Sequence, residues 1–152
     1  MGFLSRMLFG KPPRRIEHPV FGEALLMPAK YGSYWEVETE VAGQPFTIAI
    51  ETTDEQEPSR AQVDFFNRYA NNSDLAFRRA ALLLVPEYEK WVREPFPDSW
   101  REAFKFTSMS IPVAGDEQNP WDLSFECIKD RDGHLFTCSF RNGAAVELQV
   151  DG

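Results

Sequence analysis

The chain has 152 residues, of which 43% are hydrophobic and 26% are charged. This length suits one domain with a core large enough to fold without a disulfide or a metal ion. The composition excludes a disordered protein and a disulfide framework, and no apolar run approaches the ~18 residues of a membrane-spanning helix.

The formal net charge is −8, and the acidic residues are unevenly placed. The first 15 residues contain Arg6, Lys11, Arg14 and Arg15 and no acid, whereas the remainder holds 12 basic and 24 acidic residues. We therefore expect residues 1–15 to form a flexible basic segment and residues 16–152 to form a single domain. Because the acidic domain repels a phosphate backbone, we predict that it binds no nucleic acid and attracts a basic protein instead.

The N-terminal segment and the two cysteines indicate the cellular compartment in which we expect the protein to work. The first residues lack the apolar core and cleavage site of a secretory signal peptide, so we expect a cytoplasmic protein in which Cys127 and Cys138 are reduced. The basic residues 1–15 also suggest a peripheral membrane tether, because a short helix there would gather its apolar side chains on one side. Vesicle binding that persists after truncation at Pro13 would exclude this membrane-tether hypothesis.

Residues 20–51 have the pattern of an antiparallel meander. From residue 34 to residue 41, apolar or threonine side chains alternate with glutamates, which is typical of a half-buried strand. Residues 46–50 continue the alternation. The apolar residues have odd numbers in the first strand and even numbers in the second, so they share a face only if the numbers of two paired residues add up to an odd number. We predict that Val41 pairs with Phe46 across a four-residue loop, which meets this condition.

Residues 54–106 are predicted to be mainly helical. Asp54 can cap a first helix, and Asn72 or Ser73 can cap a second one. Pro86 should kink or split the second helix, because proline lacks the backbone N–H and clashes with the preceding turn. We expect a last short turn between residues 98 and 104.

Residues 106–150 return to strands. The alternation in residues 121–127 and 136–140 places both cysteines on the buried face. A turn at Asp132-Gly133 predicts that Cys127 pairs directly with Cys138, and a three-residue loop after the second strand predicts that Cys138 also faces Val146. Buried among aromatic residues, neither cysteine is expected to act as a nucleophile.

The whole pattern predicts an α+β fold. We expect an antiparallel sheet built from an N-terminal and a C-terminal β-meander, with two main helices packed on one face. On the other face, Glu36, Glu38 and Glu40 would lie side by side, where like charges repel until a cation or a basic partner arrives. The predicted partner-binding residues are Glu36, Glu38, Glu40, Glu51, Asp54, Glu55 and Glu57. The alternative is an ordinary solvated face that keeps an edge strand from aggregating.

His134 is the residue best suited to act as a general base, because Asp130 or Asp132 could orient its ring. A small hydrolase or ligand-binding enzyme that uses these three residues is the alternative function. No other residue nearby in the sequence completes a triad, and the chain lacks a nucleophile elbow and a phosphate-binding glycine loop. The histidine and cysteine spacings fit no zinc motif, and residues 130–133 suit a hairpin turn better than a calcium loop. We therefore expect no metal and no cofactor.

Several features in chain order carry a resemblance. Phe21-Gly22 opens the meander, Trp35 precedes the acidic alternation, His134 follows an Asp-x-Asp-Gly turn, and Asn142-Gly143 closes the last hairpin. This order resembles small uncharacterised bacterial families catalogued as domains of unknown function. The resemblance implies an immunity or accessory role beside bacterial toxins and implies no catalytic residues. We predict a non-enzymatic protein that binds a basic partner, such as a toxin, through its acidic surface.

Overall fold

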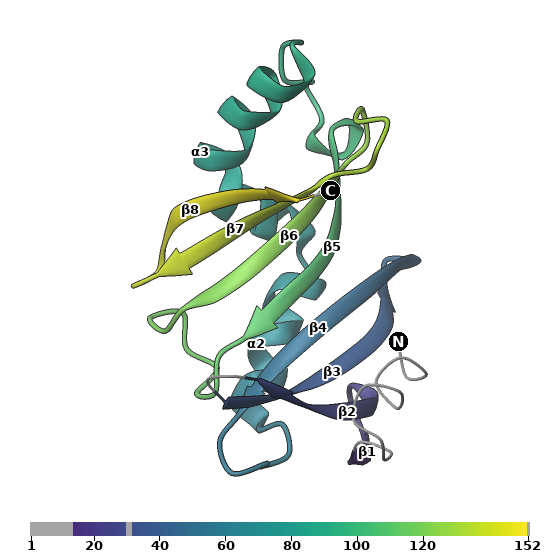
Figure 1. Cartoon of the computed structure of the whole chain (residues 1–152), viewed down its shortest axis with the longest axis vertical. Coiled ribbons are helices and arrows are strands. Elements are labelled where there is room, and N and C mark those ends of the chain that lie inside the picture. Colours follow the sequence, from purple (N-terminus) through teal and green to yellow (C-terminus); the bar gives the residue numbers. More distant parts are fainter. Residues whose placement is uncertain (1–13, 30–31, 152) are drawn as a thin grey trace.

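The computed structural model describes residues 14–29 and 32–151 and has an α+β fold (Figure 1). One open sheet contains eight strands, whose order in space is their order in the chain. The strands are β1 (Arg15–His18), β2 (Gly22–Ala29), β3 (Gly32–Val41), β4 (Gln44–Thr52), β5 (Phe104–Ile111), β6 (Trp121–Cys127), β7 (Leu135–Arg141) and β8 (Ala144–Asp151). The helices are α2 (Arg60–Ala70) and α3 (Ser73–Val92), with a 3₁₀ turn, η1 (Trp100–Glu102), before β5. No helix in the described ranges is long and apolar enough to cross a membrane.

The sheet consists of two meanders joined at one parallel pair. Neighbouring strands are antiparallel throughout, except that β4 and β5 run in the same direction. The connection between these two strands contains both helices, as a parallel pair requires a long crossover. The predicted α+β class with an N-terminal and a C-terminal meander is therefore confirmed. The predicted basic segment lies almost wholly outside the described residues.

The hairpin registers differ from the prediction although the faces are right. Val41 pairs with Gln44 and not with Phe46, because the turn is only Ala42-Gly43, both with positive φ (52° and 76°). This two-residue turn matches the right-handed twist of the flanking strands. The paired positions still sum to an odd number, so the apolar residues stay on the predicted face.

The C-terminal registers are also shifted. Cys138 pairs with Leu123 and Leu148, so the predictions that it pairs with Cys127 and Val146 are wrong. The first shift arises because the β6–β7 loop is longer than a simple Asp132-Gly133 turn. The second arises because β8 follows a two-residue turn and contains a bulge opposite residues 139 and 140. Both cysteines remain on the buried face, as predicted.

Helix boundaries follow their caps. Asp54 does not cap the first helix, because it lies in a turn with φ of 54°, and α2 begins after Ser59, whose side chain accepts a bond from the backbone N–H of Gln62. Asn72 caps α3, as predicted. Pro86 does not split α3. The hydrogen bond that Pro86 cannot donate would have gone to Leu82, which is 89% exposed, so the missing bond lies on the solvent side of the helix.

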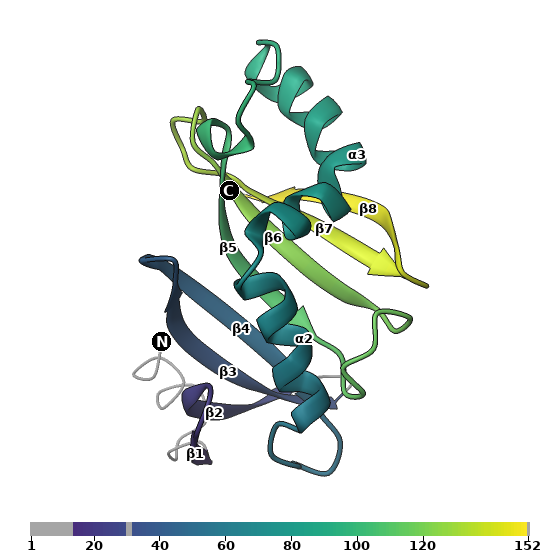
Figure 2. The same ribbon diagram turned by 180° about the vertical axis from the view of Figure 1, so that it is seen from behind.

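Aromatic side chains form much of the core. Phe65 of α2 meets the edge of Trp121 in β6 at 4.9 Å, and Tyr88 of α3 meets Phe104 in β5 at 5.7 Å between ring centroids. Figure 2 shows α2 and α3 crossing in front of the strands in this view. Fully burying a large apolar side chain contributes ~1.5–3 kcal/mol, so these contacts fix the helices against the strands.

Candidate protein-binding site

The strands from β3 to β8 present two chemically different faces, because successive side chains point to opposite sides. One face carries buried apolar residues such as Ile48, Met109 and Leu123. The registers place the charged residues on the opposite side, which we call the polar face. Its acidic members are Glu36, Glu38, Glu40, Glu51, Asp122, Glu126, Glu147 and Asp151, and its basic members in these described strands are Lys105 and Arg141.

A groove of about 800 Å³ lies on the polar face where β3 and β4 approach the turn after β4. Glu51, Asp54, Glu55 and Asp122 contribute its acidic side chains, with Tyr34 beside them. A smaller hollow of about 210 Å³ shares residues with this groove and is lined by hydroxyls. The hydroxyl residues of the hollow are Thr47, Ser108, Ser110, Ser124 and Thr137.

The parallel pair explains why the polar face is hollow there. Ala49 pairs with Ser110, and Thr47 pairs with Ser108, so small side chains stand next to one another across the β4–β5 junction. Larger side chains at these positions would fill the space above the sheet. The junction therefore provides a shallow channel with carboxylates at one end and hydroxyls along its floor.

The surroundings of Glu51 and Glu36 on the polar face make the charged form of each carboxylate less favourable. Partial burial and the charge of Asp122 raise the pKa of Glu51. Burial and the charge of Glu38 raise the pKa of Glu36 in the same way. Within the described residues no basic side chain lines the groove. A cation entering this groove would supply a counter-charge to Glu51 and Asp122, whereas Glu55 already has one in Arg14.

Glu36 is placed differently from the prediction. The sequence pattern suggested that it lies exposed beside Glu38 and Glu40, but only 7% of Glu36 is exposed, and its Oε2 has no hydrogen-bond partner in the described ranges. The reason is that β3 is an interior strand, where Glu36 lies between Leu25 of β2 and Ala49 of β4. The hypothesis that the row protects an edge strand is wrong for the same reason. Glu38 and Glu40 are exposed.

The other predicted acidic residues are divided between the groove and the solvent. Glu51, Asp54 and Glu55 line the groove, and Glu55 also lies 3.8 Å from Arg14 in an ion pair. Glu57 is exposed and does not line the groove.

The sequence analysis missed Asp122. Its alternation with Trp121 and Leu123 predicts a polar position, but only the pairing of β4 with β5 brings it close to Glu51. Since these strands are far apart in the chain, no local pattern could have indicated the contact.

The structure brings His134 and Asp130 together. The Asp130 carboxylate accepts bonds from the backbone N–H groups of Asp132 (3.1 Å) and His134 (3.0 Å), and it contacts the His134 ring at Nδ1. Although burial raises the pKa of Asp130, these bonds outweigh it and lower the pKa overall. Ligand atoms of Asp130, Asp132 and His134 lie within 4.8 Å of one another, but those of Asp130 already close the turn.

A nucleophile is missing from this turn. The Trp91 ring packs against the His134 ring in an edge-to-face contact, with 5.0 Å between the ring centroids. Among the described residues no hydroxyl or thiol forms a hydrogen bond with the His134 ring. The buried thiols are also unsuited, because burial raises the pKa of Cys127 and raises that of Cys138 to about 12. The arrangement stabilises a turn more clearly than it assembles a catalytic centre.

Comparisons with protein-family models, with curated proteins and with solved structures gave no match to this chain.

Proposed function

We propose that this protein is a non-enzymatic module that binds a basic protein partner through its polar face. The observation that carries the proposal is the groove in which Glu51 and Asp122 lie close together with no basic side chain among the described lining residues. A lysine or arginine of a partner would neutralise both carboxylates and form charge-assisted hydrogen bonds with them. Charge complementarity of this kind also accelerates association.

The proposal takes α2 and α3 as one layer on the apolar face, so that the polar face is free to meet the partner. The ring contacts of Phe65 and Tyr88 with strand residues support this arrangement. The partner we favour is a basic toxin neutralised in the cytoplasm, in keeping with the resemblance to bacterial families that contain immunity proteins. The reduced, buried cysteines are compatible with that compartment.

A charge-reversal experiment tests the polar face directly. The variant Glu38→Lys, Glu40→Lys, Glu51→Lys changes three carboxylates at the surface and leaves the buried Glu36 intact. The partner is first isolated by affinity capture from the native cell at low salt, identified, purified and titrated against the wild-type protein. We expect the variant to weaken binding at least ~100-fold, since each charged contact contributes ~1 kcal/mol or more, and we expect added salt to weaken wild-type binding.

The matched control reverses the same number of charges on the helical side. The variant Asp64→Lys, Glu87→Lys, Asp98→Lys has the same net charge as the first variant, so it separates the location of the charge from its sum. Equal loss of binding in both variants would show that only net charge matters. Unchanged binding by a folded Glu38, Glu40, Glu51 variant would reject the proposal.

A second candidate function is supported by the contact between His134 and Asp130. In a small hydrolase or ligand-binding enzyme, this pair would act as a general base oriented by a carboxylate, with Asp132 nearby. The candidate requires a nucleophile or water delivered with the substrate. A folded His134→Ala variant that keeps full ligand binding and turnover would eliminate it.

A further inference from the structure

The groove on the polar face has room and charge for an occupant that is basic and partly apolar. The carboxylates of Glu51 and Asp122 line it, and neither forms an ion pair or hydrogen bond with the part of the chain that the structure describes. Tyr34 and Val113 line the same groove, and Val113 is 45% exposed. An occupant with cations and apolar side chains would therefore match both parts of the lining.

The described chain begins beside this groove. The guanidinium of Arg14 donates to the backbone carbonyl of Glu55 at 3.1 Å and lies 3.8 Å from the Glu55 carboxylate, which belongs to the groove wall. The same guanidinium lies over the Trp35 ring at 5.5 Å. The backbone carbonyl of Arg14 accepts a bond from the N–H of Leu26 at 2.8 Å. Residues 1–13 are thus joined to the described chain at a point held close to the groove.

Residues 1–13 have the composition that the groove requires. They contain Arg6 and Lys11 and no acidic residue, and five of the seven residues from 3 to 9 are large and apolar. The described strands of the polar face carry mostly carboxylates. Charge complementarity therefore favours contact between this segment and the polar face of the same chain.

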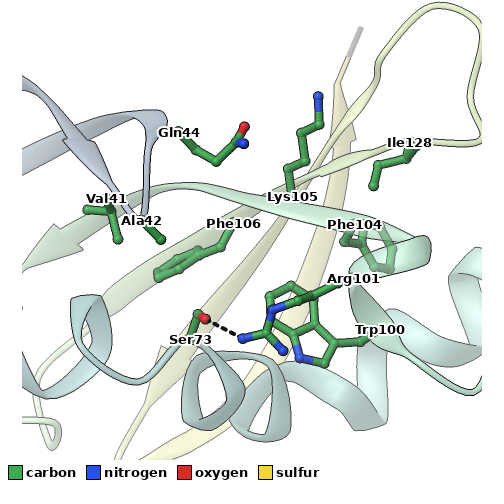
Figure 3. Close-up of a pocket in the computed structure, with 10 residues that line it drawn as sticks. All are labelled: Val41, Ala42, Gln44, Ser73, Trp100, Arg101, Phe104, Lys105, Phe106 and Ile128. Carbon is green, nitrogen blue, oxygen red and sulfur yellow. Dashed lines mark hydrogen bonds between the residues drawn. The ribbon is translucent and has the colours of Figure 1, made fainter.

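A second cavity, of about 310 Å³, does not suit a basic segment. It lies beside the β3–β4 turn, at the other end of β4 from the groove (Figure 3). Arg101 and Lys105 are among its described lining residues, and no carboxylate is. Since like charges repel, the groove is the better place for residues 1–13.

The segment is long enough to reach the carboxylates of the groove. Lys11 and Arg6 precede Arg14 by three and eight residues, which extend to at most ~10 Å and ~26 Å. Glu51 in β4 and Asp122 in β6 are two strands apart, a separation of ~10 Å. The chain between Lys11 and Arg14 is Pro12-Pro13, and because proline fixes φ, ordering it costs little conformational entropy.

We propose that residues 1–13 dock in this groove of their own chain, with Arg6 and Lys11 beside Glu51 and Asp122. A short tether gives an effective concentration on the order of 1 mM, so an intrinsic Kd of about that size keeps the segment docked about half the time. The docked segment then competes with the basic partner. That competition rests on the proposed function, whereas the docking itself does not.

A spin label on residue 5 tests the docking without a partner. The label is attached to the full-length Ser5→Cys variant, and wild-type protein treated in the same way controls for labelling of the buried cysteines. We expect the backbone amides of Ser110 and Asp122 to broaden more than that of Leu82, which lies exposed on α3. Raising the salt to about 1 M should remove most of this difference, because it shortens the Debye length to ~3 Å.

Two charge variants of the labelled chain identify the contact. Arg6→Gln with Lys11→Gln should abolish the extra broadening, whereas Arg78→Gln with Lys90→Gln, which has the same net charge and alters exposed residues of α3, should keep it. Extra broadening that persists in the first variant or at about 1 M salt would overturn the proposal, as would equal broadening of Leu82. Broadening passed from a labelled chain to a separate ¹⁵N-labelled chain would assign the segment to a second copy and would also overturn it.

Titration with the purified partner at low salt tests the competition separately. A segment docked about half the time halves the population able to bind, so the Arg6→Gln, Lys11→Gln variant should bind the partner about twofold more tightly than the Arg78→Gln, Lys90→Gln variant. Equal affinities would overturn the competition. Failure of the proposed function is distinguished by its own result, since a chain without any basic partner would still show the broadening from the spin label.

Discussion

At the scale of single residues, Glu51 carries a charge that the folded protein disfavours. Since its pKa is raised by burial and by Asp122, the folded state retains this proton to higher pH than the unfolded chain does. The resulting penalty is absent below the ordinary glutamate range and is fully present above the raised pKa. Because Glu51 is exposed to solvent, which screens this effect, we expect Glu51→Gln to cause only a small increase in the free energy of unfolding at pH 7, and the increase to vanish near pH 4.

Chemical denaturation at several pH values measures this effect. Glu57→Gln removes the same charge at an exposed position outside the groove and serves as the control. A gain for Glu51→Gln that persists unchanged at pH 4, or an equal gain for both variants, would contradict the explanation.

The same scale shows what a sequence pattern can and cannot predict about a site. Alternation correctly placed Glu36 and Glu38 on one face of β3. It could not predict that Glu36 is buried, because burial depends on the strands at both sides of β3. Nor could it bring Asp122 next to Glu51, since that neighbour depends on a pairing between distant segments. Side-chain direction is local information, whereas exposure and proximity are not.

At the scale of elements, the β5–β6 loop touches α2 at Gly115. This residue has φ of 62°, and a Cβ atom there would lie 2.6 Å from the backbone carbon and oxygen of Ala61. We expect Gly115→Ala to reduce the free energy of unfolding by more than ~2 kcal/mol, because both the conformation and the contact would be strained. Gly43→Ala is the control, since Gly43 has φ of 76° but open space around it, and should lose only ~1 kcal/mol.

Urea unfolding of the two glycine variants separates backbone strain from steric contact. Equal losses would mean that the approach of the loop to α2 does not add to the strain.

The elements also show where turn length escapes sequence analysis. The sequence pattern correctly predicts which residues of each hairpin lie on the apolar face, but the observed registers are shifted from the predicted ones. In the β6–β7 loop, the Asp130 side chain binds two backbone N–H groups and stabilises a longer turn than Asp132-Gly133 alone. Since shifts by an even number preserve the faces, hydrophobic patterning cannot detect them.

At the scale of the whole molecule, α2 contacts residues from both meanders. Phe66 meets Phe21 before β2 at 5.2 Å, and Phe65 meets Trp121 of β6 at 4.9 Å. The two meanders should therefore unfold as one unit. We expect Phe65→Ala to destabilise the protein by ~3–5 kcal/mol while circular dichroism and tryptophan fluorescence still report one coincident transition.

Leu82→Ala provides the control for truncation of an apolar side chain, since Leu82 is 89% exposed and its loss should change stability by less than ~0.5 kcal/mol. Two separate transitions in the Phe65→Ala variant, or in the wild-type protein, would show that the meanders are independent.

The match between strand order and chain order has a consequence for folding kinetics. Every antiparallel neighbour is also the next strand in the chain, so each hairpin closes over a short loop. The β4–β5 pair alone must wait for the segment from Thr52 to Phe104, which contains both helices. Because contacts distant in sequence form slowly, docking of β5 onto β4 should limit the folding rate. During synthesis the N-terminal meander emerges first with the edge of β4 unpaired, and that edge stays open to wrong partners until β5 arrives.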